Sequence, residues 1–424
     1  MRFGRWLELP WLNRERLAFY PAALFLLYVV FAALWTALTL AHGMMDPVGI
    51  PFGHVFIEFW TAAKAALGPT PAAIYDFPAF YAMQREVVAA VRPLYPWHYP
   101  PVLLLFLAPL ALVPYLWAVP LWFAANLAGY LTLVKRLALE RRLVWIGLAF
   151  PGTLLTLHIG QFGLLLVAAL GWGLLLLDER PAAAGAFIAL LAVKPHLFLL
   201  VPLALLVSRR WTAFAAATLA VILLVAASWL AFGSATWFAL FGNLGTFGAA
   251  HLLLPPATGG AADVEGFLLW NWQPSVFVMA RQLGLASAAA YLAQAAAALA
   301  AAAAVVWAWC GQAPPTLKAS VLVTANLLVS PYVYNYDLVL LILPIAWLGW
   351  HGAQHGWLPG EKLMLLVAWL LPGLIVPLAA LLGMQAGPLP VAAFLAMICR
   401  RIAHERSAAR HAGTLAVEGA GEGR

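Results

Sequence analysis

Apolar runs of about twenty residues recur along the whole sequence, and this pattern limits the fold more than any other feature. A run of that length is typical of a membrane-crossing helix, whereas a transmembrane β-barrel would show short segments of alternating polarity. The composition agrees, because only 9% of the residues are charged, against about 25% in soluble globular chains. The sequence therefore predicts an all-α polytopic membrane protein with a bundle of about 12 transmembrane helices.

The first predicted span covers residues 18–42. It is too long for the apolar part of a signal peptide and lacks a small-residue cleavage site, so we expect it to be retained. The other predicted spans are residues 114–136, 143–158, 160–177, 181–194, 196–208, 212–232, 286–310, 317–331, 336–350, 361–380 and 386–400. Several are shorter than about 17 residues, and these must kink, tilt or recruit flanking residues.

The basic residues orient these spans. On this span list, 18 of the 23 Lys and Arg residues fall on one side of the membrane. The exceptions are Lys64, Arg85, Arg92, Lys194 and Arg281. The positive-inside rule makes the rich side cytoplasmic and places both termini there. The net charge of +7 therefore does not indicate nucleic-acid binding.

This orientation leaves the apolar segment 99–114 without a full crossing. Its prolines predict a juxtamembrane or re-entrant element, and one more true crossing with a wrongly divided span elsewhere is the alternative. We expect residues 1–406 to form one transmembrane domain and residues 407–424 a disordered cytoplasmic tail. Within the domain, residues 43–113 form a first long outer loop with amphipathic juxtamembrane helices, and residues 233–285 a second outer loop.

Five polar stretches from distant parts of the chain fall at the same outer boundary of the predicted membrane. They are EFW (58–60), YPWHYPP (95–101), HIGQ (158–161), VKPH (193–196) and SPYVYNYD (330–337). Polar groups at helix ends in an apolar chain usually face a cavity, so we expect one outward-facing polar cavity. Each stretch also has a plainer interpretation, as an interfacial side chain, a helix cap, a snorkelling lysine or an aromatic belt.

Such a cavity suits sugar transfer from a lipid-phosphate donor. Lys194 and the histidines are suited to holding a phosphate, and a carboxylate such as Glu58 is suited to taking a proton from an acceptor hydroxyl. A transporter or lipid flippase is the alternative function, but it would favour charges near the membrane midplane. Cys310 and Cys399 lie at the ends of apolar runs, and nothing has the spacing of zinc ligands.

Several stretches resemble one known family in order and in sequence. They are FIEFWTAAKAALGPTPAAIYD, YPWHYPPVLLLFLAPLALVPY, the HIGQ…ERPAAAG…VKPH block, WNWQPSVF and SPYVYNYDLVLL. The chain resembles the DUF2029 / glycosyltransferase family 87 group of polyprenyl-phosphate-sugar-dependent transferases. The resemblance implies a GT-C fold and inverting transfer of a mannose-like hexose or a pentose to a lipid or glycan acceptor. It also implies a bacterial inner (plasma) membrane location, chemistry at the periplasmic face, and no cofactor beyond the lipid-linked donor.

The resemblance also implies roles for particular residues. The position of the family's acidic base is Val55 here, so Glu58, one helical turn away, is the first substitute and Asp46 the second. His54 is a weaker third choice, and an inactive family member is the alternative. By position, Lys194 and His196 would contact the donor phosphate. The residues expected to line the sugar cavity are His98, Tyr99, His158, Gln161, Asn335, Tyr336 and Asp337.

Overall fold

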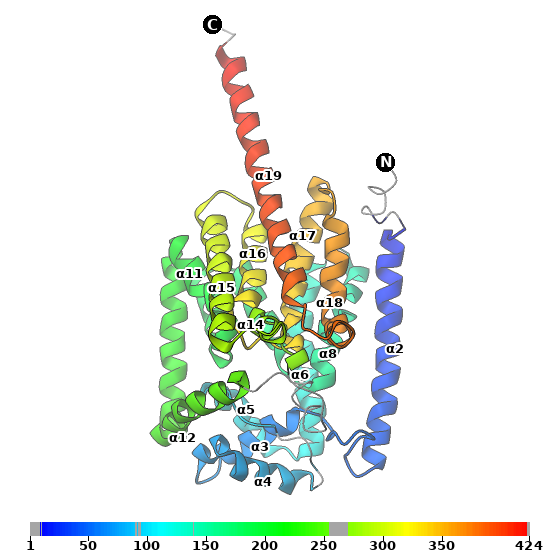
Figure 1. Ribbon diagram of the computed structural model, residues 1–424, viewed down its shortest axis with the longest axis vertical. Helices are drawn as coiled ribbons and strands as arrows, with labels where there is room; N and C mark the ends of the chain where they lie inside the picture. Colours follow the sequence, from blue (N-terminus) through cyan, green and yellow to red (C-terminus); the bar gives the residue numbers. More distant parts are fainter. Residues whose placement is uncertain are drawn as a thin grey trace. The chain divides into compact units, whose positions relative to one another are not determined.

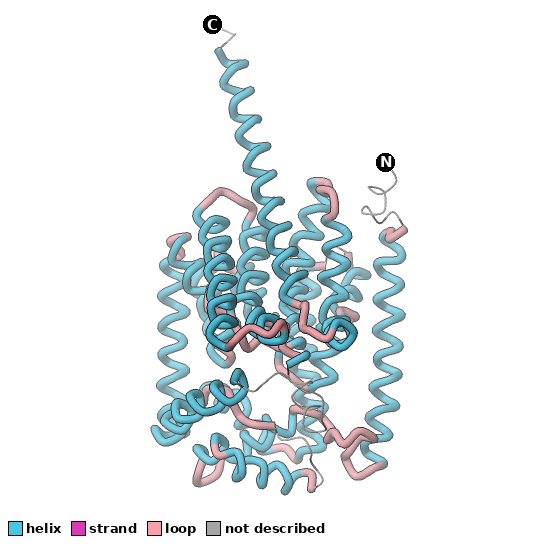
Figure 2. The backbone as a smooth tube through the Cα atoms, viewed as in Figure 1, coloured by secondary structure: helices cyan, strands magenta, loops and turns pink. Residues whose placement is uncertain are grey.

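The computed structural model describes residues 9, 11–89, 91, 95–138, 140–253 and 270–421. These residues form helices and loops and contain no strand, apart from a single bridge between Met45 and Pro51 (Figure 2). The predicted all-α class is therefore confirmed for the described part of the chain. Arg92 and residues 254–269 of the predicted second outer loop lie outside it.

Six described helices are long and apolar enough to cross a membrane, or seven if one bent pair counts as a span. The six are Arg14–Ala41, Tyr115–Leu137, Trp211–Leu244, Ser287–Cys310, Asn335–His355 and Glu361–Leu382. The four apolar helical segments Val102–Leu112, Gly163–Leu175, Pro181–Val193 and Pro315–Val329 are shorter. The protein is thus membrane-embedded and helical, and the predicted count of about 12 full spans stays a prediction.

The chain divides into two compact units, each of which is described by itself. The first unit comprises the described parts of Arg14–Pro195 and Thr212–Phe267, and the second those of Met1–Asn13, His196–Trp211 and Leu268–Arg424.

In the first unit, α2 (Arg14–Ala41) is followed by the loop 42–55 and by α3 (Phe56–Ala66) (Figure 1). Eight of the eleven α3 residues are buried, so α3 is a core helix. The predicted amphipathic character of this stretch is wrong, because neighbouring elements bury eight of its eleven residues. Its predicted place at the membrane interface stays a prediction. By contrast, α4 (Phe77–Val87) buries only Phe80 and Gln84, as expected of an amphipathic helix.

Segment 99–114 forms two short helices, α5 (Val102–Leu107) and the 3₁₀ helix η2 (Ala108–Leu112). The 3₁₀ helix η1 (Pro71–Tyr75) precedes α4, whose N-terminus is capped by Asp76 through a 3.0 Å hydrogen bond from the Ala79 amide. The short helix α5 packs against α3.

The predicted span 143–158 is a bent pair. The 3₁₀ helix η3 (Arg141–Leu143) and α7 (Val144–Leu148) are followed by α8 (Pro151–Ile159), which is inclined at 54° to them. Pro151 has no amide hydrogen to continue the α7 hydrogen-bond ladder, so the chain turns there. The unit is completed by α6 (Tyr115–Leu137), α9 (Gly163–Leu175), α10 (Pro181–Ala189) with η4 (Leu190–Val193), and α12 (Trp211–Leu253).

The boundary predicted at residue 233 falls inside α12, where Gly233 has φ 78° and breaks the helical geometry. Glycine adopts this left-handed φ without steric cost, so the helical segments on either side meet at a kink. The residues after Gly233 continue as helix to Leu253, although the richness of segment 233–285 in Gly, Pro and Trp is typical of a loop.

In the second unit, α16 (Pro315–Val329) is the central helix and packs against α15 (Ser287–Cys310), α17 (Ile342–His355) and α19 (Pro388–Gly421) (Figure 1). The remaining elements are η5 (Pro195–Leu197), α11 (Leu200–Val207), α14 (Val276–Gln282), η6 (Asn335–Leu341) and α18 (Glu361–Leu382). The helix α19 continues past residue 407, so the predicted start of the disordered tail does not coincide with a helix end.

Candidate functional site

The loop between α2 and α3 is built around Asp46. Its Oδ1 accepts hydrogen bonds from the backbone amides of Val48 (3.0 Å) and Ile50 (2.8 Å), and its Oδ2 accepts one from the Trp35 indole (3.2 Å). Both oxygens of this buried carboxylate are therefore engaged in holding the loop.

The same loop is held against the end of α8 by a close backbone approach. Gly160 has φ 79°, and a Cβ atom there would lie 2.4 Å from the Gly53 carbonyl oxygen, so only glycine fits. The Val55 amide donates to the Ile159 carbonyl (3.0 Å), and the Trp122 indole donates to the Gly160 carbonyl (2.8 Å). The HIGQ turn thereby acts as a docking point for the first loop.

This docking brings His54 and His158 together, with ring centroids 6.2 Å apart. His54 has φ 53°, an uncommon conformation for a non-glycine residue and one that is enriched at functional sites. Burial is the main cause that lowers the pKa of His54 to about 4, so its imidazole is neutral. The ring bonds to the His158 backbone, while the buried Nδ1 has no hydrogen-bond partner in the described chain.

Tyr95 was not among the predicted site residues, yet it lies beside His54, with ring centroids 5.9 Å apart. Its side chain is buried, and its hydroxyl has no hydrogen-bond partner among the described residues. Burial raises the pKa of this hydroxyl, and the nearby Tyr115, Glu58 and Asp46 raise it further. Tyr95 is therefore within electrostatic range of both candidate bases.

Glu58 and Lys194 are both buried in the first unit, and the charge of Lys194 acts on Glu58. Their exposed fractions are only 5% and 4%. Burial raises the pKa of Glu58 well above its ordinary value, and the Lys194 ammonium acts in the opposite direction. The solvated, interfacial Glu58 that was the plainer interpretation is thus excluded. A carboxylate with a raised pKa beside a buried cation is typical of sites that transfer protons.

Tyr99 and Gln161 interact directly. The Tyr99 hydroxyl lies 3.4 Å from Gln161 Oε1 and 3.3 Å from its Nε2, and both residues are buried. The Tyr99 ring packs among Phe59, Trp97 and Phe162. His98, by contrast, is half-buried against the Phe77 ring of α4, with centroids 6.0 Å apart.

The remaining four predicted residues belong to the second unit. The Asp337 carboxylate accepts a hydrogen bond from the Tyr334 amide (3.0 Å) and closes the first turn of η6. The Asn335 amide donates to the Trp272 carbonyl (2.7 Å), and the Tyr334 and Tyr336 rings are stacked at 5.3 Å. The His196 ring lies 6.5 Å from that of Tyr332. Their convergence with Glu58 on one cavity stays a prediction.

A cavity of about 370 Å³ opens beside the first loop. One wall is a face of α2, and the other walls come from α6, α8 and the loop itself. Three predicted residues, Asp46, His54 and His158, form its polar end. The other lining residues are Phe25, Tyr28, Val29, Phe31, Ala32, Trp35, Thr36, Thr39, Ile50, Pro51, Phe52, Gly53, Phe123, Ala124, Leu127 and Leu157.

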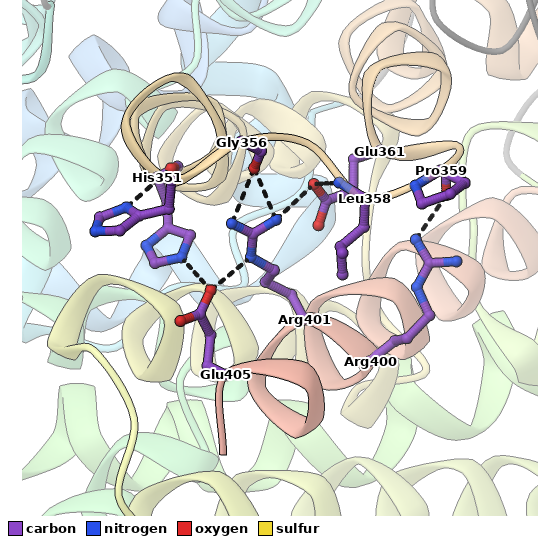
Figure 3. Close-up of polar contacts among 9 residues, drawn as sticks. His351, Gly356, Leu358, Pro359, Glu361, Arg400, Arg401 and Glu405 are labelled. Carbon is purple, nitrogen blue, oxygen red and sulfur yellow. Dashed lines mark hydrogen bonds and ion pairs between the residues drawn. The ribbon is translucent and has the colours of Figure 1, made fainter. Parts of the chain in front are cut away.

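The second unit contains a different buried charged cluster, which the sequence did not predict (Figure 3). Arg401 bonds to Glu361 Oε2 (3.1 Å), to Glu405 Oε1 (3.0 Å) and to the Gly356 carbonyl (3.0 Å). His351 Nε2 lies 2.9 Å from the same Glu405 oxygen. These contacts fasten α19 to α17 and α18, which is a structural role.

No group of three or more His, Cys, Asp or Glu side chains that could hold a metal ion occurs within the described ranges.

Comparison with known proteins gives one match. A sequence model of glycosyltransferase family 87 matches residues 97–331, which is more than half of the chain. No curated protein and no solved structure matches the chain. The matched region includes Gln161, Lys194 and His196, whereas Asp46 and Glu58 precede it.

Proposed function

Because the chain belongs to glycosyltransferase family 87, we propose that it transfers a sugar from a polyprenyl-phosphate donor to a lipid or glycan acceptor. The sugar is a mannose-like hexose or a pentose. The observation that carries this proposal is the buried Glu58–Lys194 pair in an apolar, membrane-embedded unit. No cofactor is needed, because the lipid-linked donor already carries an activated sugar.

Glu58 is the general base of the proposed reaction. Both oxygens of the other candidate, Asp46, are occupied by the backbone and by Trp35. A general base works best when its pKa lies near the pH at which the enzyme operates. Burial raises the pKa of Glu58 in this direction. Glu58 also substitutes for the carboxylate that Val55 cannot supply.

Lys194 binds the donor phosphate and stabilises it as it leaves. A buried ammonium attracts a phosphate strongly because little water screens the charge. In the proposed step, the acceptor oxygen attacks the anomeric carbon from the face opposite the phosphate. The bond between that carbon and the phosphate oxygen breaks, and its electron pair leaves with the phosphate. The hydroxyl proton passes to the Glu58 carboxylate, and the product has inverted configuration.

The proposed architecture is a GT-C fold in a bacterial inner membrane, with both termini in the cytoplasm and the site at the periplasmic face. The single-sided distribution of Lys and Arg supports this orientation. The early loop with its helices α3 and α4 supports the fold, because α3 carries the candidate base Glu58.

The test is transfer of a radiolabelled sugar from a polyprenyl-phosphate donor by the purified protein in lipid vesicles. We expect Lys194→Met to weaken donor use by about 10- to 100-fold in kcat/KM, because a charge-assisted hydrogen bond is lost. Lys64→Met is the matched control, since Lys64 is exposed on α3 and lies over the Trp60 ring. A parent protein that moves lipids across the vesicle but transfers no sugar would establish transport instead.

A further inference from the structure

The cavity beside the first loop is elongated along α2. Its α2 residues recur every three or four positions from Phe25 to Thr39, which places them on one face of the helix. Fourteen steps of helical rise give this wall a length of about 21 Å. Phe123, Ala124 and Leu127 of α6 form the facing wall. His158 meets this wall at Phe31 and Asp46 meets it at Trp35. The apolar part of the wall therefore runs from Phe25 to Phe31, about 9 Å, which suits a stretch of hydrocarbon chain.

In the described part of the chain, the polar end of the cavity lacks the cationic side chains that would attract an anion. Among the described residues that line it, none is Lys or Arg. It contains the Asp46 carboxylate, which repels a phosphate, and two histidines. Lys194, the cation proposed to bind the donor phosphate, is not part of the lining.

The same end does offer a hydrogen-bond acceptor to a hydroxyl group. His54 bonds to the His158 backbone through one ring nitrogen, which leaves its buried Nδ1 with a lone pair and no partner in the described structure. A neutral imidazole in this arrangement accepts a hydrogen bond from an O–H donor. An unsatisfied buried polar atom in a cavity is a position where a ligand gains binding energy.

We propose that this cavity binds the acceptor substrate, and that the acceptor is a lipid with an uncharged, hydroxyl-bearing head group. The hydrocarbon tail lies between α2 and α6, and a head-group hydroxyl donates to His54 Nδ1. This inference rests on the proposed function and deepens it, because it assigns the donor phosphate and the acceptor to different places in the first unit.

Tyr95 connects the two places. Its ring contacts His54 at the polar end of the cavity, and the charge of Glu58 is one of the causes that raise the pKa of its hydroxyl. The unpartnered Tyr95 hydroxyl is a second hydrogen-bonding group for the polyol head of such a lipid.

Photolabelling tests the proposal without requiring turnover. The probes are a diacylglycerol and the phosphatidic acid with the same acyl chains, each with a diazirine in one chain, added to the full-length protein in phosphatidylcholine nanodiscs. We expect diacylglycerol to label the wall peptides of α2, and unlabelled diacylglycerol to compete for this labelling. Phosphatidic acid should label these peptides weakly.

A cavity-filling substitution provides the matched comparison. Ala32→Trp places an indole in the cavity, whereas Ala33→Trp places one on the neighbouring, exposed face of α2. We expect Ala32→Trp to reduce competable diacylglycerol labelling by about tenfold and Ala33→Trp to leave it unchanged. Ala124→Trp on α6, with Ala125→Trp as its control, repeats the comparison from the facing wall if Ala32→Trp does not fold.

Two results would overturn the proposal. Equal or stronger labelling by phosphatidic acid would show that the cavity accepts an anionic head group. Labelling that is unchanged in both cavity-filling variants would place the lipid on the outer surface of α2. Labelling as expected in a protein that transfers no sugar would contradict the proposed function alone, so the two failures can be distinguished.

Discussion

Each unit of this protein buries a cluster of charged residues, and the two clusters differ in how completely their polar atoms are paired. Around Arg401, the guanidinium and the carboxylates of Glu361 and Glu405 bond to one another or to backbone, and Glu361 Oε1 is the exception (Figure 3). Around Glu58, the Tyr95 hydroxyl and His54 Nδ1 have no partner in the described residues, and a cavity adjoins His54. Paired charges hold helices together, whereas unpaired polar atoms beside a cavity are available to a substrate.

The sharpest test of this difference is Glu58→Gln. The amide has the shape of the carboxyl group but cannot accept the proton, so we expect kcat to fall by about 10²- to 10⁴-fold. The protein should remain folded, since the substitution removes an ionisable group from a buried site. Sugar transfer at saturating donor measures the first effect and a thermal unfolding midpoint the second. Glu86→Gln, on the exposed face of α4, is the control, and a Glu58→Gln variant with full activity rules out this base.

The opposite pattern is expected for Arg401→Met. Removing the guanidinium leaves the buried Glu361 without its counter-charge, so we expect a loss of about 3–5 kcal/mol in unfolding free energy. Denaturant titration in detergent measures this loss. Adding Glu361→Gln to the same chain should recover much of it, because the uncompensated charge is gone. Transfer by the remaining folded protein should be normal, and selective loss of transfer without loss of stability would contradict a structural role.

The pH dependence of transfer should report Glu58. Its raised pKa means that the base is protonated and inactive at low pH, and that activity appears as pH rises through a value well above that of an ordinary glutamate. A profile of kcat/KM against pH should therefore show an acidic limb displaced upward. A limb at the ordinary glutamate pKa would mean that another group is the base.

The Arg401 cluster should respond to pH in stability. Burial alone would raise the pKa of Glu405, but the hydrogen bond from His351 and the charge of Arg401 outweigh it and lower this pKa. A lowered pKa adds stability above the ordinary glutamate value, and this stability is lost as pH falls through the folded-state pKa. Unfolding midpoints at decreasing pH should show the loss in the parent and a smaller one in Glu405→Gln. Equal losses in both proteins would contradict the assignment.

The smallest expected effects come from two tyrosines. Tyr95→Phe removes a hydroxyl without a described partner, so we expect unchanged stability and a fall in transfer of about 3- to 10-fold. Tyr130→Phe removes a hydroxyl that donates to the Gly147 carbonyl (2.9 Å), so we expect a loss of about 1 kcal/mol in stability and normal transfer. Measuring both quantities for both variants tests the comparison, which fails if the two tyrosines behave alike.

The sequence predicted the helical, membrane-embedded character because that information is local. Apolar runs indicate where a membrane helix is stable, and prolines such as Pro151 indicate where a helix must end or bend. The burial of α3 could not be predicted, because FIEFWTAAKAA has enough polar residues to suggest an interfacial helix until its neighbours are known. The continuation of α12 past Gly233 was missed for a related reason, since the richness of segment 233–285 in Gly, Pro and Trp is typical of a loop.

The pairing of charges was the least predictable part of the site. Glu58 and Lys194 were selected as polar residues near the same boundary, but their proximity depends on tertiary packing. Tyr95 stands in an aromatic-rich stretch that is typical of a membrane interface, so nothing local distinguishes it. Arg401 was counted with cytoplasmic basic residues, and its burial follows from its bonds to the Gly356 carbonyl after α17 and to Glu361 at the start of α18.

The helix α2 is among the least enclosed parts of the first unit, since only 6% of its most apolar window is buried. It packs against α7 and η3, and the Arg14–Glu140 bridge (3.3 Å) ties its N-terminal end to the residues just before η3. One face of α2 lines the cavity, and the apolar side chains on its other faces are exposed. The proposed lipid acceptor would therefore reach the cavity by diffusing sideways within the leaflet, and its supply would depend on membrane composition rather than on aqueous solubility.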